Sequence, residues 1–408
     1  MSALLLALPA LMLRPTAYRT ACVHQSSPRA SVRLGGEFDT LPSVLKSCNE
    51  LVADDFDGQA QAELWRQSGR DPAYKVSGAI TNEPSFTRLF THETWERYTG
   101  TPSLTRWFRV TLTWRYSTVL RAVFPVSLIA SLWAFLIAGL PGVLLPRTSP
   151  VPMSLLGTAL GLLLVFRTNN SYLRLSEARE LWSQVIILIR DISQNTAISL
   201  LFDDHAKDRD FARDGAGRIC RYLAAIAWEL RAKLTGGPIA TDTKVLDALL
   251  PADEATWVAT QRSRPVQLLF ALRKELNLQY RRGNLPPQIH RKLEEDCRRL
   301  DVVMGGCERL FSSPLPPTMS RHIVRCLQLW LLGLPFVLAG TMAPFTVALW
   351  VFVVSYAFIG IDEVGVQVEQ PFEIIPMTRM CKLVMANLDE AFLHPMGRDG
   401  GSAVLATP

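Results

Sequence analysis

The feature that most constrains this chain is a pair of apolar stretches without a charged residue. Ala122–Leu140 is the first, and it ends at Gly139-Leu140-Pro141-Gly142, where glycine and proline break a helix. Val151–Phe166 is the second, and its length of about 16 residues is short of the ~20 that a full membrane span needs. A soluble fold tolerates such runs poorly. The sequence therefore predicts an all-α membrane protein.

The second apolar helix must continue into polar surroundings. No glycine or proline occurs between Phe166 and Gly215, so nothing local ends the helix there. We expect it to leave the bilayer and to pack against a soluble part of the chain.

A last apolar block, Cys326–Gly360, is too long for one upright span. It contains Pro335, Gly340 and Pro344, so it forms either two short spans or one broken helix pair. Around 219–235 lies a semi-apolar helix whose charges make it a poor lipid-facing span and a better neighbour for other helices. Four membrane-associated segments are thus expected, at about 119–140, 151–175, 219–235 and 323–360.

The two ends of the chain differ from this central part, 106–390. Residues 1–36 contain no acidic residue, because the first is Glu37, and they are rich in arginine and hydroxyl side chains. This composition is typical of an organelle transit peptide. A polar extension should follow at 37–105, and a disordered tail at 391–408.

Composition and motifs exclude several classes of function. The formal net charge of +6 suits nucleic acid, an anionic lipid surface or small anions, but no basic patch with interleaved aromatic residues supports nucleic acid. The 7 cysteines include no Cys-x-x-Cys pair, and neither a phosphate-binding loop nor a His-Glu-x-x-His motif occurs. We expect no metal site, no cofactor and no enzymatic activity.

One helix face in the second apolar run changes character along its length. Thr158, Leu162 and Phe166 recur every four residues, and the same face continues through Asn170 and Arg174. Such a face suits a water-filled path that narrows at a hydrophobic ring. The same spacing also fits an ordinary helix-packing core.

Two motifs resemble segments of the bestrophin family, above all of its bacterial and plant thylakoid branch. The first is FRTNNSYLR at 166–174, followed by Glu177 and Trp182, and the second is GIDEVGVQVEQPF at 360–372. Both stand where that family has them after a membrane helix. The motif residues that carry the resemblance include Asn169, Tyr172, Glu177, Glu369, Pro371 and Phe372.

The resemblance implies a fold and a pore. Bestrophins are homopentamers of helical subunits around a central anion pore, and Thr158, Leu162 and Phe166 match their three pore-neck positions. Arg167, Asn170 and Arg174 then become candidates for attracting anions. Arg167 alternatively pairs with Glu177 or another carboxylate. Glu373-Ile374-Ile375-Pro376 stands where animal bestrophins have an acidic run that binds calcium, so calcium should not be needed for opening.

The expected function is passive chloride flux across a plastid membrane, in particular the thylakoid, to balance charge during proton movement and so to regulate the proton motive force. Bicarbonate is an alternative ion, delivered to support carbon concentration, and membrane lipid is the expected surrounding. An alternative of another class is a non-conducting membrane scaffold that binds partner proteins.

Overall fold

The computed structural model describes residues 38–51, 92–112, 114, 117–141, 149–203, 206–235 and 240–393, all within one compact unit, Gly36–Pro408. In this part of the chain every regular element is helical, apart from an isolated bridge between Ala339 and Met342. The all-α expectation is confirmed there. The predicted leader at 1–36, part of the predicted extension, and the tail from residue 394 lie outside the described residues.

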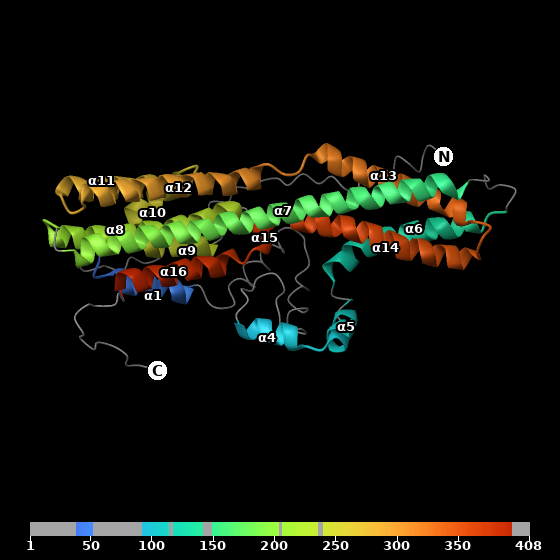
Figure 1. Cartoon of the computed structure of the whole chain (residues 1–408), viewed down its shortest axis with the longest axis horizontal. Helices are drawn as coiled ribbons and strands as arrows, with labels where there is room; N and C mark the ends of the chain where they lie inside the picture. Colours follow the sequence, from blue (N-terminus) through green and yellow to red (C-terminus); the bar gives the residue numbers. More distant parts are fainter. Residues whose placement is uncertain are drawn as a thin grey trace. The chain divides into compact units, whose positions relative to one another are not determined.

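One long helix, α7 (Pro150–Ala197), connects the two halves of the described unit (Figure 1). Ser149 caps its start by accepting a hydrogen bond from the Val151 amide, and a π-helical turn, η4 (Ile198–Phe202), extends its end. Its 48 residues correspond to about 72 Å, more than twice the ~30 Å thickness of a bilayer core. The helix therefore continues beyond any membrane, as the sequence predicts.

The first half of α7 packs against two other apolar helices, α13 (Pro317–Leu338) and α14 (Pro344–Glu369), and both of these also pack against α6 (Thr118–Ala138). In the apolar windows of these helices only 17% to 28% of the residues are buried within the chain. Their remaining surface needs an apolar surrounding, which lipid or neighbouring subunits supply. The described residues contain 4 segments that are long and apolar enough to span a membrane, Val119–Ala138, Pro150–Phe202, Pro287–Leu338 and Pro344–Glu369.

The last apolar block forms two helices. α13 ends at Leu338, Gly340 adopts a left-handed φ of 86°, and α14 begins at Pro344. Glycine tolerates this φ and proline suits a first helical turn, so both residues serve the reversal between the two helices. The first alternative drawn from the sequence, two spans, describes this arrangement.

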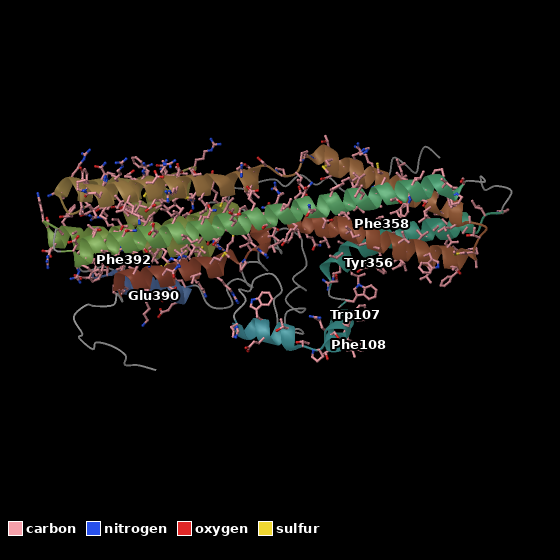
Figure 2. The ribbon with its side chains drawn as sticks, in the orientation of Figure 1. Trp107, Phe108, Tyr356, Phe358, Glu390 and Phe392 are labelled. Carbon is pink, nitrogen blue, oxygen red and sulfur yellow. The ribbon has the colours of Figure 1, made fainter. Side chains whose placement is uncertain are left out.

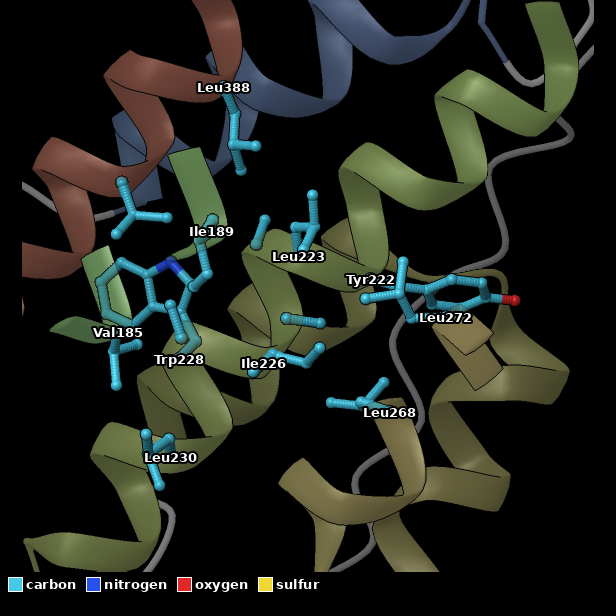
Figure 3. Packing of buried hydrophobic residues seen from close by; sticks show 14 of the residues in the cluster. Val185, Ile189, Tyr222, Leu223, Ile226, Trp228, Leu230, Leu268, Leu272 and Leu388 are labelled. Carbon is cyan, nitrogen blue, oxygen red and sulfur yellow. The ribbon is translucent and has the colours of Figure 1, made fainter. Parts of the chain in front are cut away.

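The second half of α7 belongs to a bundle with a single large core. In Figure 3, Val185 and Ile189 of α7 lie against Leu223 and Trp228 of α8, with Leu388 of α16 nearby. The helices that contribute to this core are α1 (Leu41–Leu51), α8 (Arg209–Leu234), α9 (Ala240–Leu249), α10 (Ala252–Thr260), α11 (Arg264–Arg282), α12 (Pro287–Ser312), α15 (Pro371–Ile374) and α16 (Met377–Leu393).

The segment 219–235, expected among the membrane-associated segments as a neighbour for other helices, packs against other helices in the structure. This segment is the greater part of α8, whose side chains are buried on every side by other helices, and it is absent from the four candidate spans of the described chain. Its charges find partners in protein: Arg231 donates to Asp242 (2.6 Å) and Thr378 (2.8 Å), and Arg221 donates to Thr40. A buried helix with partnered charges fits a protein core better than a lipid-facing position.

Two short helices, α4 (His92–Gly100) and α5 (Ser103–Leu112), precede the first membrane helix. Trp107 and Phe108 on α5, labelled in Figure 2, are 76% and 67% exposed. Tryptophan and other amphipathic aromatic side chains are common at the level of lipid headgroups. The composition of α5 therefore fits the border of a membrane.

Asp242→Asn should destabilise the bundle strongly. It leaves the Arg231 guanidinium, whose side chain is 5% exposed, without its carboxylate partner, and breaking such a buried pair costs about 3–5 kcal/mol. The measurement is thermal unfolding in detergent, followed by the fluorescence of the buried Trp182 and Trp228. Asp39→Asn is the control, because its pair with Arg213 is more than half exposed and is worth about 0–1 kcal/mol. Equal melting temperatures for the two variants would contradict the prediction.

Candidate functional site

The two faces of α7 differ in how far the rest of the chain buries them. One face is buried against the chain's own helices, at positions spaced three and four residues apart that include Leu160, Leu164, Arg167 and Ser171. The other face is exposed. Because the buried face fixes how the helix is rotated, it also determines which side chains point away from the chain.

The predicted neck residues lie on the exposed face. Leu162 is 57% exposed and Phe166 is 52% exposed, and Thr158 is also exposed. The Thr158 hydroxyl donates to the backbone oxygen of Ser154, one turn earlier on the same helix (3.0 Å). The stripe is thus an apolar surface that the single chain does not cover, and it is available to a pore or to other subunits.

Arg167, directly after Phe166, turns to the buried face and pairs with Asp362 of α14. The two side chains are 5% and 13% exposed. Gly365, nearly one turn after Asp362, lies beside the guanidinium stem, and a Cβ placed there would meet Arg167 atoms at 3.7 to 3.9 Å. The geometry favours pairing with a carboxylate over exposure of this charge to a permeating anion.

Arg174 joins three parts of the chain. Its guanidinium donates to the backbone oxygens of Leu310 and Ser313, at 2.7 Å each, and more weakly to that of Glu369 (3.4 Å). The Leu310 and Ser313 oxygens belong to the end of α12, where carbonyls lack helical partners and attract a cation. The Glu369 carboxylate accepts from the Leu315 amide (3.2 Å) just beyond.

The two motifs found in the sequence are therefore in contact with each other. Arg167 meets residue 362 and Arg174 meets residue 369, so the same offset of 195 residues recurs seven positions further along both helices. Two such contacts on parallel helices set both the rotation and the axial register of α7 against α14.

The remaining motif residues have separate places. Asn169 and Tyr172 are exposed, with Asn170 half-buried. Glu177 pairs with Arg309 of α12 at 2.6 Å, although both side chains are largely exposed. Pro371 and Phe372 start the short helix α15 and are buried, Phe372 within the large core.

Sequence reasoning missed the partners of the two arginines. The expectation of a carboxylate for Arg167 did not name Asp362, and the partners of Arg174 are backbone oxygens, which no side-chain pattern marks. Among the described residues, no group of three or more His, Cys, Asp or Glu side chains could hold a metal ion.

Comparison with known proteins identifies the family of this chain. A family model described as "Bacterial/Fungal Bestrophin protein" matches residues 99–390, which confirms the resemblance inferred from the two motifs. A crystal structure of a bacterial bestrophin homolog from Klebsiella pneumoniae superposes with a TM-score of 0.59 and 26% sequence identity, covering 67% of this chain and 98% of that one.

Two curated relatives carry channel names. "Voltage-dependent chloride channel 2, chloroplastic" of Arabidopsis thaliana is 30% identical over 314 residues, which are 74% of this chain and 72% of the relative. A "Voltage-dependent anion channel-forming protein" of Ralstonia nicotianae is 33% identical over 272 residues, 65% of this chain and 84% of the relative.

Arg174→Lys should loosen the junction of α7, α12 and α14. A single ammonium cannot reproduce the planar fork that reaches two carbonyl oxygens, and loss of one charged hydrogen bond costs about 1.5–3 kcal/mol. The measurement is the melting temperature of the purified protein in detergent. Arg179→Lys is the matched control, since Arg179 is exposed on the same helix and forms no ion pair within the described residues. A melting temperature unchanged by Arg174→Lys would show that the contacts carry little stability.

Proposed function

Because the chain belongs to the bestrophin family, we propose that it is an anion channel through which chloride moves passively across a membrane. The observation that carries this proposal is the exposed stripe of Thr158, Leu162 and Phe166 on α7. An apolar stripe on a membrane helix suits a pore wall, provided that other copies of the helix complete the ring.

The neck would act through hydration. Rings of Leu162 and Phe166 side chains form a narrow apolar passage from which water is easily lost, and such constrictions act as barriers in channels. Weakly hydrated anions such as chloride cross a barrier of this kind at lower cost than strongly hydrated ions. Size and hydration therefore supply the selectivity, without a stereospecific contact.

Bestrophins often have a bulkier apolar side chain at the outer position of the neck, where this chain has Thr158. Its hydroxyl donates to the Ser154 carbonyl on its own helix, so this polar group is already satisfied. The γ-methyl group is then what the side chain adds to the neck surface. This end of the neck is wider than a ring of larger residues would make it, and its wall stays apolar.

A closed ring requires several copies, and we propose five, as in the family. The single chain leaves the neck stripe exposed, and most of its apolar membrane surface is unburied. One helix cannot surround a path by itself. A symmetric ring covers the lateral surfaces and places one α7 per subunit at the axis.

We place the channel in a plastid membrane, in particular the thylakoid. Support comes from the relative named as chloroplastic and from the acid-free sequence at 1–36. In that membrane, anion flux would balance the charge of moving protons and so regulate the proton motive force. Fluorescent fusions of the whole chain and of a form that begins at Glu37 test this placement, which predicts plastid targeting only for the first.

Two alternatives to a chloride channel can be separated from it by experiment. Bicarbonate, like chloride a small monovalent anion, would pass the same neck, and reversal potentials in mixed salts separate the two ions. A non-conducting scaffold would also use the helical bundle, and it differs from the channel in predicting no anion flux. Ion-selective current from the purified protein alone excludes the scaffold.

The first test of the pore is Phe166→Ala in liposomes that contain the purified protein and a chloride gradient. Wild type should pass chloride. Replacement of the bulkiest neck side chain by alanine should raise the flux roughly tenfold, which corresponds to a barrier lower by about 1.4 kcal/mol. Discrimination between small and large anions should fall at the same time, because the passage is wider.

Phe345→Ala is the matched control for this experiment. Phe345 lies near the start of α14 and is 72% exposed, so the same truncation is made away from the neck. This variant should conduct like wild type. Absence of anion flux from the wild type, or equal flux from wild type and Phe166→Ala, would refute the proposed pore.

Calcium removal should leave the current unchanged. The segment after Phe372 offers one carboxylate, Glu373, before Ile374 and Ile375, whereas calcium takes six to eight oxygen ligands. The measurement is single-channel recording in planar bilayers with calcium present and then chelated. Loss of the current on chelation would contradict the prediction.

A further inference from the structure

We propose that Arg167 and Asp362 form a positioning pair that sets the rotation of α7 and so aims Phe166 into the neck. This inference rests on the proposed neck and adds to it the residues that hold its geometry. Neither side chain touches the permeating ion in this arrangement. They act through the helix that carries Phe166.

The first observation is adjacency. Phe166 and Arg167 are consecutive, and in a helix consecutive side chains point about 100° apart. Phe166 is 52% exposed, whereas the Arg167 side chain is 5% exposed and lies against α14. Any rotation of α7 that releases Arg167 from Asp362 also turns the Phe166 ring away from its present direction.

The second observation is that neighbouring contacts on α7 and α14 support the pair. Gly365 of α14 lets the Arg167 stem pack closely, with 3.7 to 3.9 Å between a hypothetical Cβ and its atoms. Seven residues along, Arg174 holds α7 to the Glu369 carbonyl and to the end of α12. Two contacts in the same register resist rotation better than one.

The third observation is electrostatic. A guanidinium buried beside a carboxylate has its charge largely compensated locally, so its field in the pore is weak. The positioning role and a direct role in anion attraction therefore predict opposite outcomes. If Arg167 attracted anions, loss of Arg167 would lower chloride flux, whereas loss of the opposing Asp362 charge would raise it. If the pair aims Phe166, both losses disturb the neck in the same direction.

The experiment compares Arg167→Gln, Asp362→Asn and the double substitution in planar bilayers. The readout is the permeability ratio of a large anion to chloride, measured from reversal potentials, with oligomeric state checked by size-exclusion chromatography. We expect both single substitutions to raise the ratio about threefold or more, with the double variant no worse than the stronger single one, since contacting residues are not additive. Shifts of opposite sign, or an unchanged ratio, would overturn the inference.

Two control variants test for a general effect of charge. Glu363→Gln removes a neighbouring carboxylate that bonds Gln367 (2.9 Å), and Arg179→Gln removes an exposed arginine from α7. Both should keep the wild-type ratio. A shift in either control as large as that of Asp362→Asn would also overturn the inference.

A single substitution leaves one buried charge without its partner, which destabilises the folded subunit. A further variant is therefore needed that removes both charges. If either single variant fails to assemble, Arg167→Met with Asp362→Leu removes both charges and keeps the volume apolar. That double variant should assemble and still show the raised ratio. A wild-type ratio in it would overturn the positioning role. The proposed channel is tested separately, because wild-type flux and the Phe166→Ala effect do not depend on these variants.

Discussion

The whole arrangement depends on one helix, α7, that passes from an apolar membrane surrounding into a protein core. α7 continues for 48 residues, so its first half lies at membrane depth and its second half lies in a protein core. A helix can do this because its backbone hydrogen bonds are internal in both surroundings. Its side chains must change instead: Leu160 of the apolar half belongs to a small cluster, whereas Trp182, Val185 and Ile189 enter the large core. The motif from Phe166 to Arg174 lies at this change of surroundings.

Buried charge has a different role in each half. In the bundle, Arg231, Asp242 and Thr378 connect α8 to α9 and α16, so the cost of burying them is offset by several hydrogen bonds. At the junction, Arg167 and Asp362 connect two parallel helices near the level at which the apolar segments end. A misplaced ion pair costs more than a misplaced methyl group, and such pairs therefore specify register. In the proposed channel, this register would set the geometry of the neck.

Local signals predicted much of the fold from sequence, and non-local ones predicted little. The end of α6 beside Gly139, the reversal at Gly340 before Pro344 and the continuation of α7 beyond Phe166 all follow from residues within a few positions. The charges of the segment 219–235 predicted that it packs against other helices, but no local pattern showed which helices surround it. Its arginines and glutamate found partners on other helices, which no local pattern reveals.

The candidate site has the same limit, with one instructive exception. Periodicity identified the stripe of Thr158, Leu162 and Phe166, and the structure leaves it exposed, but exposure on one chain cannot tell a pore wall from a subunit contact. The partner of Arg167 lies 195 residues away, beyond any spacing rule. Yet the two motifs repeat a seven-residue step, and parallel helices that touch twice must share that step. Once the Arg167–Asp362 pair is known, this step places residue 369 beside Arg174, where its backbone oxygen accepts the hydrogen bond.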